Sequence, residues 1–518
     1  MLHVDGRDVP LPATPPTATL LSALRSRGFV GTKEGCGDGD CGACTVALVG
    51  TGADGTTTYR AVNSCLVPVG SVVGVGVLTV EGVSGAGEQL HPVQQAIVDC
   101  AGSQCGYCTP GFVMSMVAGY HDPHSRTEAG LDPEVVEGNL CRCTGYAPIR
   151  RACARLGTGT TTATTTATAA GDGTADPGAP RVPDVPVAAA RATATGTAAA
   201  RTSATAPQPR RRVEPPALVQ AAGRSFHRPR SLAEALALLA EHPGATVLAG
   251  GTDLGLELSH HTLDPAVVVS VEDVAELHVL RRTGSRLLVG GGVTLTRLER
   301  EAAGVLPVMD EMLRWFAARQ VRNRATLGGN LGTASPIGDL LPVLLALDAE
   351  VVLSGPGGTR TVEVADYFTG YRQTVRRDGE LVERVDLPLG PTTGRRSSQA
   401  YKVGKRGTDD ISVVAAAFVV DRGEDGLVRH ARLAYGGVAA TPVRALEAEA
   451  ALVGEVVDGA TVDRVAEELV DTFTPLDDHR GSAAYRRRLV GSLFEKFCAE
   501  VLTTEAPKTV VLTTEPAP

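Results

Sequence analysis

The sequence predicts a multidomain α+β protein, and three observations lead to this prediction. Its 518 residues exceed the length of chain that usually folds around a single hydrophobic core, because domains usually contain roughly 100 to 200 residues. Residues 157–216 are rich in Thr, Ala, Gly and Pro and lack the large apolar side chains that a core needs. Strand-like and helix-like segments occur on both sides of this stretch. We therefore expect several folded units, with a disordered linker at 157–216.

The composition is that of a globular protein without a strong charge bias. The hydrophobic share is 43%, the charged share is 21% and the net charge is -9, so no basic surface for nucleic acid is indicated. The start, MLHVDGRDVPLP, lacks the charged and apolar regions of a signal peptide. No apolar run approaches the roughly 20 residues that span a bilayer. These features predict a soluble, cytoplasmic protein that binds neither nucleic acid nor a membrane.

The part before the linker divides into two patterns. Residues 1–83 contain short β-branched runs broken by Gly and Asn, which predict a small sheet with loops. Residues 84–156 change to helical spacing, which predicts a small helical bundle. Its clearest helix starts at Pro110, where a first turn tolerates proline, and carries apolar residues at i, i+4 and i+8: Phe112, Met116 and Tyr120.

The part after the linker contains two α+β stretches. In residues 217–395, Ser231 and Glu234 form a capping box that predicts the start of a helix, and strands alternate with helices beyond it. Residues 396–502 form the second stretch. Residues 503–518 repeat the motif VLTTE and end in proline, which predicts a disordered tail.

Ten of the eleven cysteines precede the linker, which indicates that the part of the chain before the linker has a function that depends on cysteine. A disulfide framework is the alternative, but it is typical of small secreted chains. Cys36, Cys41 and Cys44 have the C-x4-C-x2-C spacing of a plant-type [2Fe-2S] site, and Cys65 supplies a fourth thiolate. Zinc also accepts four thiolates, but it usually takes paired C-x2-C knuckles. The glycines of this loop permit sharp turns with N–H groups facing the sulfurs: Gly35, Gly37, Gly39 and Gly42.

A second set of four cysteines combines a C-x2-C pair with a C-x-C pair. Cys105 and Cys108 form the first pair, and Cys141 and Cys143 form the second. One intervening residue can bring both C-x-C sulfurs to the same iron, so we expect each motif to hold one iron. The C-x-C spacing is unusual for zinc, which favours an iron–sulfur site. The remaining cysteines are predicted to be buried small hydrophobic residues: Cys100, Cys153 and Cys498.

Two glycine segments indicate a site for a phosphate-bearing cofactor. The first is VLAGGTDL at 247–254, and the second is TLGGNLGTASPIGD at 326–339. Alone, the first would be a strand that ends in a tight turn. Together, the two loops could approach a pyrophosphate with backbone N–H groups and hydroxyls. Neither fits G-x-G-x-x-G, so a Rossmann site is disfavoured.

These motifs resemble one family. EGCGDGDCGACTV, QCGYCTPGFVMSM and GNLCRCTGYAPIRRA resemble the iron–sulfur domains of xanthine dehydrogenase and its molybdenum hydroxylase relatives, and the glycine segments resemble that family's FAD domain. The resemblance covers about residues 1–155 and 220–500. It implies a β-grasp ferredoxin domain, a four-helix [2Fe-2S] domain, an FAD domain of the vanillyl-alcohol oxidase type and an α+β C-terminal flavoprotein domain.

The resemblance also implies cofactors and their ligands. Two [2Fe-2S] clusters would be held by Cys36, Cys41, Cys44 and Cys65, and by Cys105, Cys108, Cys141 and Cys143. FAD would be contacted by Val247, Leu248, Ala249, Gly250, Gly251, Thr252, Asp253, Leu254, Phe316, Thr326, Leu327, Gly328, Gly329, Asn330, Asp339 and Lys402. Alone, Lys402 would be a solvated surface lysine. A role in setting the flavin potential is implied for Asp409 or Asp410.

The implied function is electron transfer within a xanthine dehydrogenase-like enzyme of purine catabolism. Electrons would pass from molybdenum through the second cysteine set, the first set and FAD to NAD, with no catalytic residue in this chain. The chain ends at Pro518 without room for a molybdopterin domain, which implies a separate molybdopterin-binding large subunit and a hetero-oligomer. A flavin–iron–sulfur reductase for another oxidase or oxygenase, and a non-enzymatic metal scaffold, are the alternatives. The holoenzyme substrate and the electron acceptor stay open.

Overall fold

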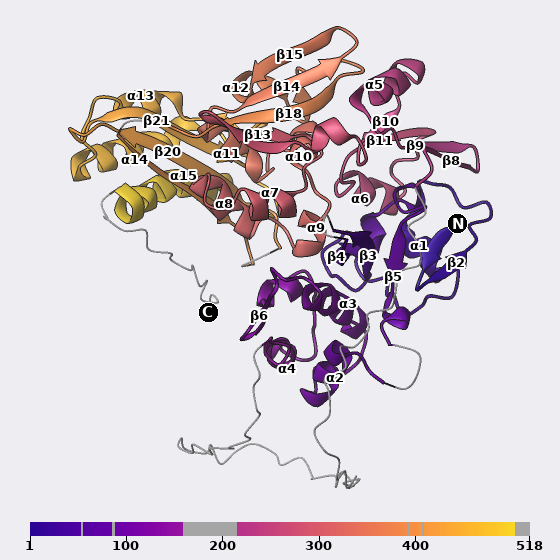
Figure 1. The fold of residues 1–518 in the computed structure, drawn as a ribbon. Coiled ribbons are helices and arrows are strands. Elements are labelled where there is room, and N and C mark those ends of the chain that lie inside the picture. Colours follow the sequence, from indigo (N-terminus) through magenta and orange to yellow (C-terminus); the bar gives the residue numbers. More distant parts are fainter. Residues whose placement is uncertain (53–54, 85–88, 159–214, 392–393, 407–408, 503–518) are drawn as a thin grey trace, which may run out of the picture.

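The computed structural model describes residues 1–52, 55–84, 89–158, 215–391, 394–406 and 409–502. Within these ranges the chain forms four units that follow one another along the sequence (Figure 1). The predicted tail and nearly all of the predicted linker lie outside the described residues, so both stay predictions. Helices and sheets occur together, as the α+β prediction requires.

The first unit is a five-stranded sheet with one helix packed on it. The strand order is β2-β1-β5-β3-β4, and β1 and β5 pair in parallel while the other pairs are antiparallel. Thr19 starts the helix by accepting a hydrogen bond from the Ser22 N–H. The elements are β1 (Leu2–Val4), β2 (Arg7–Val9), α1 (Leu20–Arg25), β3 (Thr45–Thr51), β4 (Thr57–Asn63), η1 (Ser64–Leu66) and β5 (Gly76–Leu78).

The second unit is helical. Its central helix α3 (Thr109–Tyr120) begins with proline in the first turn, as predicted, and buries every residue from Gly111 to Gly119. Such a helix must be enclosed on all sides. The other helices are α2 (Pro92–Asp99) and α4 (Ala147–Ala154), and the fourth helical segment is a 3-10 turn, η4 (Pro133–Val136).

The third unit contains two larger sheets and a two-stranded one formed by β16 (Phe368–Gly370) and β17 (Gln373–Thr374). A four-stranded sheet has the order β10-β11-β9-β8, and a five-stranded antiparallel sheet has the order β12-β13-β18-β14-β15. As predicted, Ser231 caps α5 through the Glu234 N–H at 3.2 Å. The strands are β8 (Leu218–Ala221), β9 (Arg224–His227), β10 (Thr246–Leu248), β11 (Val267–Ser270), β12 (Leu280–Thr283), β13 (Arg286–Gly290), β14 (Glu350–Gly355), β15 (Gly358–Glu363) and β18 (Leu381–Pro388). The helices used below are α5 (Leu232–Glu241), α6 (Leu254–Ser259), α8 (Pro307–Trp315), α9 (Arg319–Arg322), α10 (Leu327–Thr333) and α11 (Leu340–Ala346).

The fourth unit is an antiparallel sheet of order β19-β20-β21-β22. Helix α11 of the third unit packs on this sheet, and α15 packs on β20. Strand β20 is therefore buried along almost its whole length, which explains its unbroken apolar run. The elements are β19 (Arg395–Val403), β20 (Val414–Arg422), β21 (Val428–Gly436), β22 (Val443–Arg444), α13 (Leu446–Leu452), α14 (Gly459–Thr472) and α15 (Ala483–Phe497).

Helix α9 lies where the first three units meet (Figure 1). Gln320 donates to Ser115 Oγ of the second unit at 2.9 Å, and Asn323, at the end of the helix, donates to the Ala61 carbonyl of the first unit at 2.8 Å. Arg322 is 1% exposed and forms an ion pair with Glu134 of the second unit. These buried polar contacts hold the three units in one arrangement.

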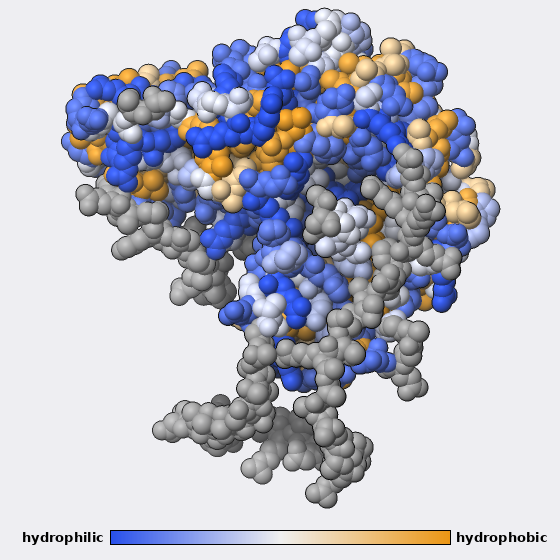
Figure 2. Space-filling view, viewed as in Figure 1, coloured by the Kyte–Doolittle hydropathy of each residue, from blue (hydrophilic) through white to orange (hydrophobic). Residues whose placement is uncertain are grey.

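The surface is mixed in polarity. Figure 2 shows hydrophilic side chains over most of one face, with apolar residues in separate patches between them. Among the described residues, no helix combines the length and the apolar character that crossing a bilayer would require.

Candidate functional site

The four cysteines of the first unit lie as two pairs. Cys36 and Cys41 are hydrogen-bonded through their thiols, and the sulfur atoms of Cys44 and Cys65 are 3.4 Å apart. Cys44 and Cys65 are buried, while Cys36 and Cys41 are half-buried. A two-iron cluster takes two thiolates on each iron, so two adjacent thiol pairs are the donor set that it needs.

The backbone around this first set presents N–H groups to the sulfurs. The N–H groups of Asp38 and Cys41 point to Cys36 Sγ at 3.3 and 3.4 Å, and the Cys36 N–H points to Cys41 Sγ at 3.3 Å. The hydrogen bond from Cys41, followed by these amides, lowers the pKa of Cys36 to about 5 although burial opposes it. A Cβ on Gly42, where φ is +63°, would lie 2.1 Å from the Gly138 carbonyl oxygen. The loop therefore fits a cluster and tolerates only glycine at that position.

The four cysteines of the second unit also form two pairs, but not the predicted ones. Cys105 is hydrogen-bonded to Cys143, and Cys108 is hydrogen-bonded to Cys141. These contacts favour one iron for Cys105 with Cys143 and one for Cys108 with Cys141, whereas the spacing had suggested one iron for each motif. The two segments face each other in opposite directions, so each thiol meets the one across the gap instead of its sequence neighbour. Cys105 and Cys143 are exposed, whereas Cys141 is buried.

The remaining cysteines differ from one another. All eleven cysteines are free thiols, which excludes the disulfide framework. Cys153 and Cys498 are buried as predicted, and burial raises the pKa of Cys498 to about 12. Cys100 is only half-buried, because it ends a surface helix beside Arg155, so the prediction of burial is wrong there. In the part of the chain that the structure describes, no three His, Cys, Asp or Glu side chains are grouped around one point as a single metal ion would require, whereas a two-iron cluster takes two thiolates on each iron.

The two cysteine sets are joined by direct hydrogen bonds. The Leu140 N–H donates to the Cys41 carbonyl at 3.0 Å, and Asn139 donates to the Gly42 carbonyl at the same distance. The Tyr107 hydroxyl donates to the Glu34 carbonyl. Each loop that carries one set therefore lies against the loop that carries the other.

The two predicted glycine segments come together in the third unit. Strand β10 runs into Gly250 and Gly251, and a Cβ on Gly250 would lie 1.8 Å from the Arg324 carbonyl oxygen. Thr326 caps α10 through the Gly329 N–H at 2.9 Å. Since Arg324 lies two residues before Thr326, the first glycine loop packs against the start of the second.

Polar atoms near these loops are placed where a ligand could bind. The Oδ1 atom of Asn330 is buried without a hydrogen-bond partner among the described atoms. Asp253 accepts a hydrogen bond from Thr333 at 3.2 Å, which links the helices that follow the two glycine turns. Buried polar atoms normally have partners. An amide oxygen accepts hydrogen bonds, so Asn330 Oδ1 fits a hydroxyl or N–H donor of FAD, while the backbone N–H groups of the glycine turns are the groups that fit its phosphates.

Three other predicted FAD residues lie together at the junction with the fourth unit. Lys402 Nζ donates to the Trp315 carbonyl at 3.1 Å and pairs with Asp339 at 2.8 Å. Phe316 follows Trp315 directly and is half-buried. The Lys402 side chain is 7% exposed, so it is not a solvated surface lysine.

The structure distinguishes Asp409 from Asp410. Asp410 accepts the N–H groups of Lys405 and Arg406 at 2.6 and 2.8 Å, so its carboxylate holds its own loop. Burial raises the pKa of Asp409 to about 6, although Arg406, Lys402 and Arg322 oppose it. Gly407 and Thr408 lie outside the described residues. Because Asp410 is bonded to its own loop, Asp409 is the better candidate for an electrostatic effect on a neighbouring group.

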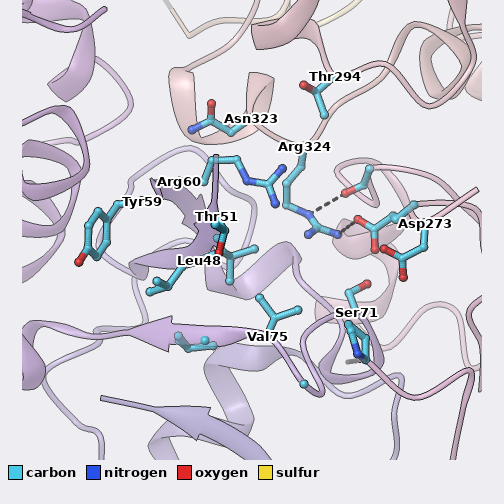
Figure 3. Close-up of a pocket in the computed structure, with 18 of the residues that line it drawn as sticks. Leu48, Thr51, Tyr59, Arg60, Ser71, Val75, Asp273, Thr294, Asn323 and Arg324 are labelled. Atoms are coloured by element: carbon cyan, nitrogen blue, oxygen red, sulfur yellow. Dashed lines mark hydrogen bonds and ion pairs between the residues drawn. The ribbon is translucent and has the colours of Figure 1, made fainter. Parts of the chain in front are cut away.

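A cavity of about 400 Å³ separates the sheet of the first unit from the third unit (Figure 3). The guanidinium groups of Arg60 and Arg324 lie side by side in it. Arg324 donates to the Gly250 carbonyl at 2.9 Å and pairs with Glu272 at 2.5 Å. Sequence reasoning missed Arg324, although a cation two residues before Thr326 was a signal. This arginine fixes the backbone of the first glycine loop from the side of the cavity.

Comparisons with known proteins agree with this arrangement. Residues 2–70 match the family described as 2Fe-2S iron-sulfur cluster binding domain, and residues 79–154 match the [2Fe-2S] binding domain. Residues 220–390 match the FAD binding domain in molybdopterin dehydrogenase, and residues 399–501 match the CO dehydrogenase flavoprotein C-terminal domain. The predicted fold class and the predicted cofactor types, two [2Fe-2S] clusters and FAD, are confirmed.

Whole-chain relatives differ in what they act on. Xanthine dehydrogenase 1 of Arabidopsis thaliana is 33% identical over 96% of this chain and 39% of its own length. Nicotinate hydroxylase of Emericella nidulans is 31% identical over 96% of this chain and 40% of its own length. A chain of CO dehydrogenase from Oligotropha carboxidovorans is 30% identical, with a TM-score of 0.50, over 52% of this chain and 94% of that chain. This chain thus spans about two fifths of the first two relatives. It belongs to the molybdenum hydroxylase family, as a module with two [2Fe-2S] binding domains and an FAD-binding domain.

Proposed function

We propose that this chain is the electron-transfer subunit of a xanthine dehydrogenase-like molybdenum hydroxylase. It carries electrons from a molybdopterin-binding large subunit to FAD and then to NAD. The observation that carries the proposal is a continuous series of contacts from the exposed thiols of the second set to the glycine loops. The clusters and FAD supply the redox chemistry when bound, and the protein fixes their positions.

The series of contacts begins at the surface of the second unit. Cys105 and Cys143 are exposed there, next to Tyr107 and Leu140, which are 51% and 42% exposed. Exposed apolar side chains beside a functional site are typical of a surface to which another protein docks. We assign this surface to the large subunit, because electrons must enter where the second set reaches the surface.

The next contacts lead from the second set to the first. Leu140 precedes the ligand Cys141, and its N–H bonds to the carbonyl of Cys41. One hydrogen bond and two short stretches of backbone therefore connect the two proposed ligand sets. This order agrees with electron flow from the second set to the first.

The last contacts lead from the first set to the flavin segments. Helix α6 starts at Leu254, where the first glycine segment ends, and packs on η1, which contains the ligand Cys65. A Cβ on Gly255 would lie 2.2 Å from the Leu66 carbonyl oxygen. At the other end of α6, His260 contacts Asp38 at 2.5 Å. The helix that leaves the proposed FAD loop thus rests directly on the first set.

The proposed ligands follow from these contacts. Each [2Fe-2S] cluster is assigned to its four cysteines, and the pyrophosphate of FAD is assigned to the loops at 247–254 and 326–330. Phe316, Asp339 and Lys402 are assigned to the isoalloxazine end, because they lie together. Arg406 belongs to the proposed flavin-side loop of the fourth unit, and Asp40 belongs to the loop that carries the first cysteine set. The charges of these two side chains interact electrostatically, so the two loops are neighbours.

The assay of the molybdenum-free chain tests the division of labour. The purified full chain should be reduced by NADH and should pass electrons to an artificial dye, because FAD accepts hydride. It should not oxidise xanthine, nicotinate or carbon monoxide, because neither FAD nor an iron–sulfur cluster held here activates their bonds. Adding the large subunit should restore substrate-dependent reduction of NAD.

The same assay separates the alternatives. Substrate oxidation by the molybdenum-free chain would contradict the proposed division of labour. A flavin that NADH does not reduce would move the acceptor from NAD to oxygen or a quinone. A reductase for a different oxygenase would pass electrons to that partner without any large subunit, but it does not explain the second cysteine set.

Arg324 provides a test of the proposed FAD loop. Arg324→Met should weaken FAD binding by about tenfold or more, because a hydrogen bond to a charged group contributes roughly 1.5 to 3 kcal/mol. Titration of the apoprotein with FAD measures the change. Glu272→Gln is the matched control, since it removes the ion pair but leaves the bond to Gly250. Equal effects of both variants would show that Arg324 acts through the cavity charge instead of the loop.

A further inference from the structure

The loop that follows Cys141 is closed by its own hydrogen bonds. The Cys141 N–H donates to the Tyr146 hydroxyl at 3.0 Å, and the Tyr146 N–H donates to Thr144 Oγ1 at 3.2 Å. Tyr146 has φ of +65°, a left-handed conformation that costs energy for a residue with a side chain. Tyr146 directly precedes α4, and in this conformation its N–H bonds to Thr144 Oγ1. This hydrogen bond fixes the position of the Thr144 side chain.

Thr144 makes two contacts with one sulfur atom. Its hydroxyl lies 3.0 Å from Cys141 Sγ, and its N–H points to the same sulfur at 3.4 Å. As a free thiol, Cys141 could be donor or acceptor in the first contact. As an iron ligand it is a thiolate and has no hydrogen to donate. The hydroxyl must then donate, and the Tyr146 N–H occupies its acceptor side.

We propose that Thr144 is a positioning residue that raises the reduction potential of the second [2Fe-2S] cluster by an O–H···S hydrogen bond to Cys141. One-electron reduction adds negative charge that is shared by the sulfurs. A donor aimed at a ligand sulfur therefore stabilises the reduced cluster more than the oxidised one. This inference rests on the ligand set in the proposed function and adds a determinant of its electron flow.

The first cluster site is built differently. Its two half-buried sulfurs, those of Cys36 and Cys41, receive backbone N–H groups from Asp38, Cys36 and Cys41. Among the described residues, the hydroxyl at a sulfur of this set is that of Ser64 beside Cys44, and it is unrelated to the loop of Thr144. A side-chain substitution can thus change the potential of the second cluster while the donors of the first stay in place.

Thr109 is a matched control for Thr144. Each threonine directly follows the last cysteine of its motif, Cys108 or Cys143. The Thr109 hydroxyl, however, bonds to Ser103 Oγ at 2.7 Å and not to a sulfur. Removing it alters the same kind of loop without removing a hydroxyl donor to the cluster.

The test is an EPR-monitored redox titration of the full chain and its variants. Thr144→Val keeps the side-chain shape and should lower the potential of one cluster by about 59 mV, which corresponds to roughly tenfold in the equilibrium constant of a one-electron couple. Thr144→Ser should restore the potential, and Thr109→Val should leave it unchanged. The Fe–S stretching bands should show a deuterium shift that Thr144→Val reduces, because the variant loses the hydroxyl donor and keeps the backbone N–H.

Iron analysis is done first, because it separates the two levels of the argument. A wild-type chain with a single cluster would refute the ligand assignment itself. With both clusters present, an unchanged potential in Thr144→Val, or an equal shift in Thr109→Val, would overturn the role of Thr144. Loss of iron in Thr144→Val but not in Thr144→Ser would also overturn it, because the hydroxyl would then retain the cluster instead of setting its potential.

Discussion

Cys143→Ala should remove roughly half of the iron from the chain and leave FAD bound. The variant deletes one of four thiolates, and its partner Cys105 cannot hold an iron alone. Cys143 is exposed, so its loss creates no cavity in the core. The glycine loops belong to a different unit and keep their contacts. Iron and flavin contents, together with the loss of one EPR signal, measure the result.

Cys100→Ser is the control for this substitution. Cys100 lies in the same unit and is half-buried, but it pairs with no other cysteine in the described structure. Its replacement should keep all iron. A Cys143→Ala chain with full iron content would show that the proposed ligand set is wrong.

Glu134→Ala should destabilise the junction of the second and third units by about 3 kcal/mol, because it leaves Arg322 buried with less countercharge. Arg322 is 1% exposed and pairs closely with Glu134, whereas Glu299 is farther away at 3.7 Å. Burial already lowers the pKa of Arg322 to about 10. Urea unfolding, followed by the visible absorption of the clusters, should show an earlier transition.

Two further variants identify the cause of that loss. Glu137→Ala removes an exposed carboxylate near η4 and should change stability by less than about 0.5 kcal/mol. Glu134→Ala combined with Arg322→Met removes both charges and should recover most of the stability, since a buried pair replaced by apolar groups is often neutral. A double variant as unstable as Glu134→Ala would assign the effect to packing.

Local sequence patterns predicted much of this molecule. Pro110 and the apolar spacing behind it predicted α3, and Ser231 with Glu234 predicted α5, because caps and helical periodicity act within a few residues. The cysteine spacings likewise predicted both thiol sets. These features depend on neighbours along the chain, which a sequence displays directly.

Features that depend on contacts between distant segments were not predicted. The pairing of Cys105 with Cys143 follows from the direction in which two loops face each other, and spacing alone suggested the other pairing. Arg324 acts on Gly250, which is 74 residues away. Lys402 is buried only because Asp339 and the Trp315 carbonyl lie beside it. Three-dimensional proximity decided each case.

The burial of the first thiol set has a consequence for how the protein is made. Cys44 and Cys65 are 2% and 1% exposed, with α6 of the third unit packed over η1 and the loop of the second unit bonded to Cys41 and Gly42. A scaffold protein that delivers iron and sulfide cannot reach these thiols once the units have closed. If these thiols hold a cluster, as proposed, we therefore expect an order of maturation in which the first cluster is inserted while the units are still apart and their closure then covers it.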